Sequence, residues 1–149
     1  MPRTDMIDIK EAQEVFIDCL KSRGLRYTSQ REAILETFLS SMKHLTVEEL
    51  YALVKEKNMD IGYATVARNM KFLVECGIAD EIKVGNKRTR FERHYGRQHH
   101  DHLICLKCGA FIEVHDSNIE MLQNKLAEAN DFVPQRHKLE IYGICRECR

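Results

Sequence analysis

Two Cys-x-x-Cys pairs are the residues in this chain whose spacing most clearly indicates chemistry. The first pair is Cys105 and Cys108, and the second is Cys145 and Cys148. Each pair places two thiols around a tight turn, and two such turns together offer the four sulfurs of a closed, tetrahedral zinc site. A single pair would leave open a redox dithiol or free cysteines. Because two pairs occur in one short segment, we predict a structural Zn²⁺ site that fastens the last strand to an earlier one.

The two remaining cysteines, Cys19 and Cys76, occupy apolar positions of predicted helices. We expect both of them to be buried, reduced core residues. Residues 1–10 lack the apolar segment of a secretory signal, so we expect a cytoplasmic protein, whose thiols are kept reduced. Six cysteines in that compartment indicate metal binding before disulfides.

A second candidate for metal chemistry is the tetrapeptide His99-His100-Asp101-His102. On an extended segment alternate side chains point to opposite faces, so His100 and His102 share one face and His99 and Asp101 the other. This geometry divides the tetrapeptide between two metal sites, although a solvated turn is the alternative. Imidazole with carboxylate suits Fe²⁺, Mn²⁺, Zn²⁺ or Ni²⁺ without selecting sharply among them. The remaining candidate ligands, each on its own more typical of a surface, are Glu92, Glu113, Glu120, His44 and His137.

The first half of the chain is predicted to hold four helices followed by a two-stranded ribbon. Two helices begin at capping boxes, Ser29 with Glu32 and Thr46 with Glu49. The other predicted elements are helices at 7–23 and 64–76 and a hairpin of 78–84 with 87–92 around Gly85-Asn86. This order is typical of a winged helix-turn-helix, which places one helix in the DNA major groove. The cations on the last helix and the ribbon are, by themselves, more typical of a solvated surface than of a DNA contact, and the net charge is zero.

The second half changes character after His102. Predicted strands at 103–106 and 110–114 flank the first cysteine pair, and a helix at 118–130 and a strand at 138–144 follow. We therefore predict an α+β protein with a winged helix-turn-helix domain at 1–93, a hinge at 94–98 and an α/β domain with the four-cysteine zinc site at 99–149.

Several classes of function are not supported by the sequence. A hydrophobic fraction of 44% and a charged fraction of 31% indicate a globular protein, and the apolar runs are too short to span a bilayer. There is no glycine-rich phosphate loop and no HExxH helix, and no nucleophile stands beside a base. We expect neither catalysis nor a small-molecule substrate nor a membrane partner.

Longer motifs extend these observations along the chain. They are Gly24-Leu25-Arg26 with Thr28 and Arg31, His44–Tyr51, Ile61–Val66, His99–Gly109 and Tyr142–Cys145. With them the chain from Gly24 to Cys148 resembles the ferric uptake regulator family of metal-dependent bacterial repressors, which includes a peroxide-sensing branch. The resemblance implies a homodimer in which the second domain dimerises and the first binds a palindromic operator in double-stranded DNA.

The resemblance also implies roles for individual residues. The regulatory metal, Fe²⁺ or Mn²⁺, would be held by His44, Glu92, His100, His102 and Glu113, and a third metal site by His99, Asp101, Glu120 and His137. Metal that binds the DNA-competent arrangement of the domains more tightly would shift the population towards it. The implied DNA-binding residues are Arg26, Tyr63, Thr65, Ala67, Arg68 and Lys71.

Two departures from the family pattern affect these expectations. Ala67 stands where members usually carry a tyrosine that contacts a base, and an alanine can touch a thymine methyl but cannot donate a hydrogen bond. The segment from Glu92 to His100 is one residue longer than in many relatives.

Three functions are consistent with these motifs. The favoured one is an Fe²⁺-responsive repressor of iron-uptake genes, because glutamates stand at 92 and 113, where peroxide-sensing relatives tend to carry aspartates. The alternative is a peroxide-sensing repressor of oxidative-stress genes. A more remote alternative is a metal-storage protein without specific DNA binding.

Overall fold

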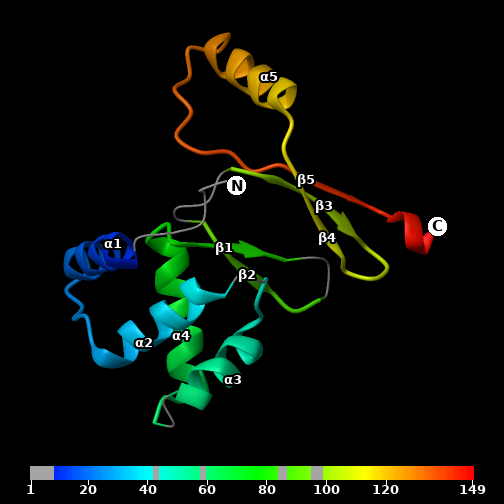
Figure 1. The fold of residues 1–149 in the computed structure, drawn as a ribbon. Helices are drawn as coiled ribbons and strands as arrows, with labels where there is room; N and C mark the ends of the chain where they lie inside the picture. The colour runs from blue at the N-terminus through cyan, green and yellow to red at the C-terminus, as the bar shows by residue number, and fades with distance from the viewer. Residues whose placement is uncertain (1–8, 42–43, 58–59, 84–86, 95–98) are drawn as a thin grey trace, which may run out of the picture. The chain divides into compact units, whose positions relative to one another are not determined.

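The computed structural model describes residues 9–41, 44–57, 60–83, 87–94 and 99–149, and divides the chain into two compact units. Unit 1 comprises residues 1–97 and unit 2 residues 98–149 (Figure 1). Within the described ranges, no helix combines the length and the apolarity that crossing a membrane requires. Each unit has its own sheet.

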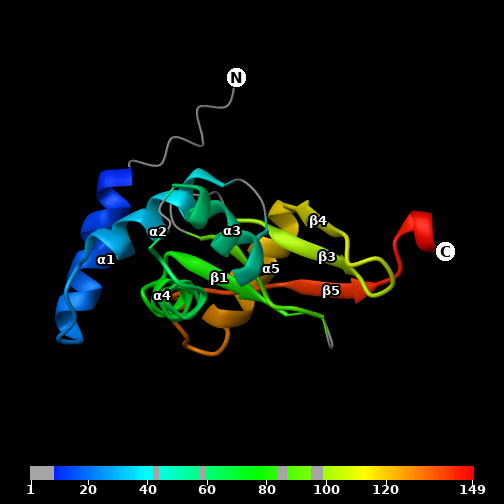
Figure 2. The same cartoon turned by 90° about the horizontal axis from the view of Figure 1, so that it is seen from below.

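Unit 1 contains the expected order of four helices and a ribbon. Its elements are α1 (Ile9–Ser22), α2 (Ser29–Ser40), α3 (Val47–Lys57), α4 (Tyr63–Glu75), β1 (Ala79–Ile82) and β2 (Arg90–Arg93). The helices enclose an apolar core to which each contributes, with Phe16, Leu35, Leu50 and Met70 among its buried side chains. Helix α1 packs against α2, and α2 packs against both α3 and α4 (Figure 2).

One of the two predicted capping boxes is confirmed and the other is wrong. The Thr46 backbone N–H donates to the Glu49 carboxylate at 2.9 Å, and the Glu49 backbone N–H donates to the Thr46 hydroxyl at 3.2 Å. At α2 the N-cap is Thr28, whose hydroxyl accepts from the backbone N–H of Arg31 at 3.3 Å. Ser29 is instead the first helical residue. Thr28 has the extended backbone that an N-cap needs, and its hydroxyl satisfies one of the first-turn N–H groups that have no partner within the helix.

The expectation for Cys19 and Cys76 is also wrong. The two form a disulfide, and each is half-buried instead of lying in the core. Cys19 lies near the end of α1 and Cys76 is the C-cap of α4, with their Cα atoms 5.9 Å apart, a normal distance for a disulfide. Helical periodicity indicates only that a position faces inward, and does not tell which other helix end it meets.

The ribbon is shorter than predicted and begins and ends at different residues. Strands β1 and β2 are antiparallel, with Asp80 opposite Glu92, and β2 begins at Arg90 instead of Lys87. The predicted Gly85-Asn86 turn lies outside the described residues. The His94 backbone N–H donates to the Ile78 carbonyl at 2.9 Å, so the ribbon pairing continues into the predicted hinge, whose other residues, 95–98, are not described.

Unit 2 is a three-stranded sheet with one helix. Its elements are β3 (Asp101–Cys105), β4 (Phe111–Val114), α5 (Ser117–Glu128), β5 (Glu140–Gly143) and the short 3₁₀ helix η1 (Arg146–Cys148). The strand order is β4-β3-β5, in which β3 pairs antiparallel with β4 and parallel with β5. The central strand begins at Asp101, two residues before the predicted start, so it includes half of the histidine tetrapeptide.

The register of this sheet separates two faces. Leu103 lies opposite Ile112 on one side and Ile141 on the other, so these three side chains share a face. His102 lies opposite Glu113 and Glu140, on the other face. Helix α5 stands apart from the strands in Figure 1, and none of its twelve residues is buried. Unit 2 therefore holds its helix with little apolar packing of its own.

Candidate metal sites

The four paired cysteines come together at one end of the unit 2 sheet. Cys105 ends β3, and Cys108 follows in the turn before Gly109. Cys145 is the N-cap of η1, and Cys148 is the last residue of η1. Their sulfurs all lie within 4.8 Å of one another, and the sulfurs of Cys108 and Cys145 are 3.8 Å apart. A regular tetrahedron of thiolates at the usual zinc–sulfur bond length has sulfurs about 3.8 Å apart. The residues present therefore fit a four-coordinate zinc ion.

Backbone geometry prepares these sulfurs as ligands. The backbone N–H groups of Cys108 and Cys145 donate to the Cys105 sulfur at 3.5 and 3.4 Å, and they lower the pKa of that thiol to about 5. The pKa of Cys148 is raised to about 12 by thiol hydrogen bonds with Cys145 and Cys108, with burial and the charge of Cys105 adding to the effect. Because a bound cation stabilises thiolates, four crowded sulfurs favour a divalent metal over four free thiols.

A second group of ligands lies entirely within unit 2. It consists of His99, Asp101, Glu120 and His137, whose ligand atoms lie within 4.8 Å of one another. The Nε2 atoms of both histidines are 3.2 Å from Oε1 of Glu120, and His99 is 3.2 Å from Asp101. The set joins the start of β3 to α5 and to the segment before β5. These polar contacts connect α5, none of whose residues is buried, to the start of β3 and to the segment before β5.

Unit 1 brings together two residues of the predicted regulatory set. An isolated antiparallel bridge pairs Leu45 with Phe91, through backbone hydrogen bonds of 2.9 and 2.7 Å. The neighbouring residues, His44 and Glu92, are thereby placed opposite each other, and their side chains are 2.8 Å apart. Glu92 is buried, with only 4% of the residue exposed. A buried carboxylate next to an imidazole is a pair of donors suited to a cation.

Unit 2 brings together the other three residues of that set. The His100 and His102 rings have centroids 4.8 Å apart, and Nε2 of His100 is 3.7 Å from the Glu113 carboxylate. His102 is buried, and lies opposite Glu113 in the β3–β4 register. The side chains of residues 99–102 alternate between two faces, as predicted. His99 contacts Asp101 on one face, and His100 contacts His102 on the other.

The chain is similar to known proteins over most of its length. The model of the ferric uptake regulator family matches residues 22–142, which is most of the chain. The chain belongs to the ferric uptake regulator family. A peroxide-responsive repressor of Staphylococcus epidermidis is 32% identical to it, with 97% of this chain and 95% of that protein covered. The ferric uptake regulation protein of Bordetella parapertussis is 39% identical, with 87% and 94% covered.

A solved structure of the same family extends the likeness to the fold. The ferric uptake regulator of Helicobacter pylori, described as having three functional metal-binding sites, matches with a TM-score of 0.80 at 28% identity. The match covers 99% of this chain and 97% of that one. The mixed helix-and-sheet fold is thus that of a ferric uptake regulator family protein.

In this family context the outward face of α4 is the candidate DNA surface. Arg68 and Lys71 are exposed on it, Tyr63 is exposed in the first turn, Ala67 is half-buried, and Val66 and Met70 are in the core. Thr65 is half-buried at the edge of that face, and Arg26 is exposed in the segment between α1 and α2. Arg68 and Lys71, three residues apart, therefore share the outward face of α4, and Tyr63 is exposed in the first turn of the helix.

Arg31 and Asn69, to which the sequence analysis assigned no role, form a polar network beside this face of α4. The Nε of Arg31 donates to the buried Asn69 side chain at 3.2 Å, and Asn69 donates to the Thr65 carbonyl at 2.8 Å. The Arg31 guanidinium also lies over the Phe72 ring. Arg31 therefore connects α2 to α4. A polar residue at a core position of a helix, as Asn69 is, was the signal that could have revealed the network.

Glu48 is a further residue near α4 to which the sequence analysis assigned no role. It accepts a hydrogen bond from the Tyr63 hydroxyl at 3.3 Å and pairs with Arg88 at 3.5 Å. The pKa of Tyr63 is raised by partial desolvation and by the nearby Glu48 carboxylate. A tyrosine hydroxyl is protonated at neutral pH even without this shift, so Tyr63 can donate to Glu48.

Proposed function

We propose that this chain is a metal-dependent DNA-binding transcriptional repressor, which responds to Fe²⁺ and controls iron-uptake genes. The observation that carries the proposal is the distribution of the regulatory ligands. Unit 1 contributes His44 and Glu92, and unit 2 contributes His100, His102 and Glu113. Neither half by itself offers the four to six ligands of a tight site. A regulatory ion that takes ligands from both units would bind tightly in one arrangement of them.

Metal control then follows from linkage. Without the ion, the two units would sample arrangements of which only some fit an operator. An ion that binds the DNA-competent arrangement better shifts the population towards it, and DNA binding tightens the metal site by the same factor. The histidine and carboxylate donors suit Fe²⁺ or Mn²⁺, and the four-cysteine site would hold Zn²⁺ as a structural ion without an open position. The third set, His99 with its partners, would hold a further ion that fastens α5.

The DNA partner is proposed to be a palindromic operator read by α4. In this proposal Tyr63, Thr65 and Arg68 of α4 would meet bases or phosphates, and Lys71 and Arg26 would contact the DNA backbone. Ala67 replaces the hydrogen-bonding side chain of relatives, so this position contributes at most contact with a thymine methyl. A repressor of this kind acts in the cytoplasm, where the chromosome lies.

The experiment that tests the proposal is a gel-shift series on DNA from the chain's own promoter. The zinc-loaded protein is titrated anaerobically with Fe²⁺ or Mn²⁺ and with a chelator too weak to remove the four-cysteine zinc. We expect operator affinity to rise at least about tenfold with regulatory metal, which is within the usual range of allosteric coupling. Equal binding with and without metal would contradict metal control. No specific binding in any metal state would indicate a storage protein.

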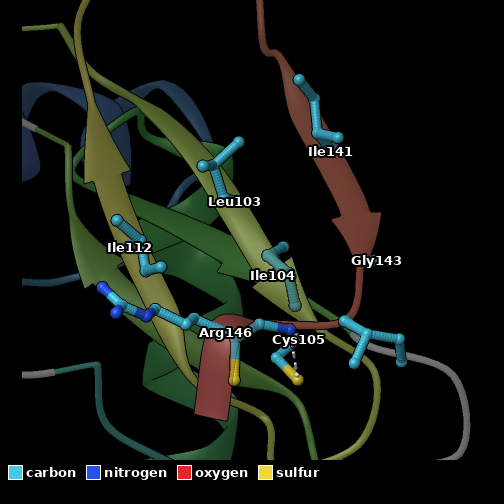
Figure 3. A pocket seen from close by; sticks show the side chains of 9 residues that line it. Leu103, Ile104, Cys105, Ile112, Ile141, Gly143 and Arg146 are labelled. Atoms are coloured by element: carbon cyan, nitrogen blue, oxygen red, sulfur yellow. Dashed lines mark hydrogen bonds between the residues drawn. The ribbon is translucent and has the colours of Figure 1, made fainter. Parts of the chain in front are cut away.

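We further propose that the active form is a homodimer joined through unit 2. The Leu103, Ile112 and Ile141 face is visible in Figure 3 and lines a hollow of about 310 Å³. Large apolar side chains are exposed throughout this unit, namely Leu106, Ile112, Met121, Leu122, Leu126, Phe132, Val133, Ile141, Tyr142 and Ile144. An apolar surface of this extent is typical of an interface that a second copy covers.

The dimer is tested by placing a charge on this face. Ile141→Glu is expected to raise the dimer dissociation constant at least about 100-fold, because desolvating an unpaired carboxylate in an interface costs several kcal/mol. Sedimentation of the zinc-loaded protein measures it. Lys125→Glu, which also places a glutamate in unit 2 but at an exposed cation, is the control. An Ile141→Glu protein that remains dimeric at low concentration would place the interface elsewhere.

Peroxide sensing is the second candidate function, favoured by the 32% identity to the staphylococcal peroxide-responsive repressor. It predicts that Fe²⁺ with hydrogen peroxide adds one oxygen atom to a ligating histidine, detected by intact mass. Persistence of the unmodified mass after loss of operator binding would exclude it.

A further inference from the structure

The Cys19–Cys76 disulfide is a feature that the proposed metal chemistry does not use. It joins two residues 57 apart in sequence, one near the end of α1 and the other at the C-cap of α4. The family match begins at residue 22, so Cys19 and nearly all of α1 precede it. The cross-link thus fastens α1 to the helix that carries the candidate DNA surface.

The ends of α1 and α4 are joined by other interactions besides the disulfide. Arg23 and Glu75 form an ion pair between the same two helix ends, and both side chains are partly exposed. The backbone of Leu25 donates to the Leu20 carbonyl and that of Ile78 to the Leu73 carbonyl, so both helices stop at glycine-containing caps beside the junction. Elsewhere α1 is held to its own unit by the side chains Ala12, Phe16 and Leu20. The disulfide is the covalent part of this attachment.

Accessibility and compartment favour reversible chemistry at this pair. Cys19 and Cys76 are both half-buried, so neither residue is fully enclosed in the core of unit 1. The proposed function places the chain in the cytoplasm, where disulfides are mostly transient and redox-sensing. The bond belongs to unit 1 and the four-cysteine set to unit 2, and the two share no cysteine, so oxidation here need not involve the zinc ligands.

We propose that Cys19 and Cys76 are a reversible thiol–disulfide site that attaches α1 to the end of α4 when oxidised and loosens it when reduced. The oxidant is a low-molecular-weight disulfide. One protein thiolate attacks it, forming a mixed disulfide and releasing one small thiol. The second protein thiolate then attacks the mixed disulfide and releases the other. Two cysteine protons and two electrons leave the protein, and the oxidant becomes two thiols.

The physical effect of the bond is on the stability of α1. A cross-link closing a long loop removes entropy from the unfolded chain, and more so for longer loops, so α1 opens less often when the bond is intact. Tyr63 and Thr65 lie at the opposite end of α4 from Cys76, so the bond leaves the candidate DNA surface uncovered. We therefore expect oxidation to stabilise unit 1 without blocking the operator. This inference rests on the proposed function only for the compartment.

The test uses full-length, zinc-loaded protein equilibrated in glutathione buffers from strongly reducing to oxidising. Peptide mapping under non-reducing conditions follows the Cys19–Cys76 bond, and hydrogen exchange follows the α1 amides. We expect the amides around Phe16–Leu20 to exchange at least about tenfold more slowly in the oxidised protein. Cys19→Ser/Cys76→Ser should exchange like reduced wild type in every buffer. Glu75→Gln, which removes the ion pair but leaves both cysteines, should retain the redox response.

Two outcomes would overturn the proposal. One is a bond that fails to form, or that fails to be reduced, across the whole buffer series. The other is a bond that forms while α1 exchange is unchanged. Zinc content and the metal-dependent gel shift are measured on the same samples. If the serine variant still binds its operator in a metal-dependent way, a failed redox response counts against this inference alone.

Discussion

Removal of zinc from the four-cysteine site is expected to abolish the ordered structure of unit 2 while leaving unit 1 folded. Among the described residues of unit 2, the buried hydrophobic side chains are Ile104 and Cys105 alone, whereas unit 1 has a core drawn from all four helices. Structural zinc in small domains contributes about 10–16 kcal/mol of apparent binding free energy, which becomes folding free energy. So few buried side chains cannot replace that contribution.

Hydrogen exchange on the full chain measures this effect, with the α2–α4 amides as the internal reference. Strong chelation, or Cys145→Ser, should remove protection from β3 and β5. Glu147→Gln, an exposed neighbour within η1, should leave it intact. Protection of β3 that survives a measured loss of zinc would show that the sulfur cluster is incidental to folding.

Loss of one regulatory ligand is expected to remove metal activation of DNA binding almost entirely. His102→Ala should reduce the metal-dependent gain in operator affinity to near unity, through a loss of regulatory metal affinity of at least about 100-fold. His102 is buried beside His100 and opposite Glu113, so no other described side chain is poised to take its position without moving the strand. Titration with Mn²⁺, followed by fluorescence anisotropy of labelled operator, gives both quantities.

Two matched histidine changes show whether the effect belongs to that site. His115→Ala alters an exposed histidine outside all three ligand sets and should leave activation unchanged. His99→Ala should mainly increase hydrogen exchange in α5, since His99 connects the sheet to Glu120. If His99→Ala abolished activation and His102→Ala did not, the assignment of the regulatory and third sites would have to be exchanged.

The sequence by itself determined the features that depend on local spacing. Two Cys-x-x-Cys turns present sulfurs wherever the chain folds them, and alternation along a strand separates His99 and Asp101 from His100 and His102. The Thr46 capping box depends on a four-residue segment, and it formed as expected. The order of helices and strands likewise followed from periodicity within each segment. Metal binding by these sets stays a prediction.

Only the tertiary structure decided which distant residues meet. The Leu45–Phe91 bridge places His44 opposite Glu92, and no local pattern around either residue indicates that pairing. The Arg31–Asn69 contact connects two helices, and the Cys19–Cys76 bond connects two helix ends that the sequence interpretation treated as separate core positions. Such contacts depend on how the helices pack and on where each one stops. These are properties of unit 1 as a whole, because each of its four helices contributes to the same core.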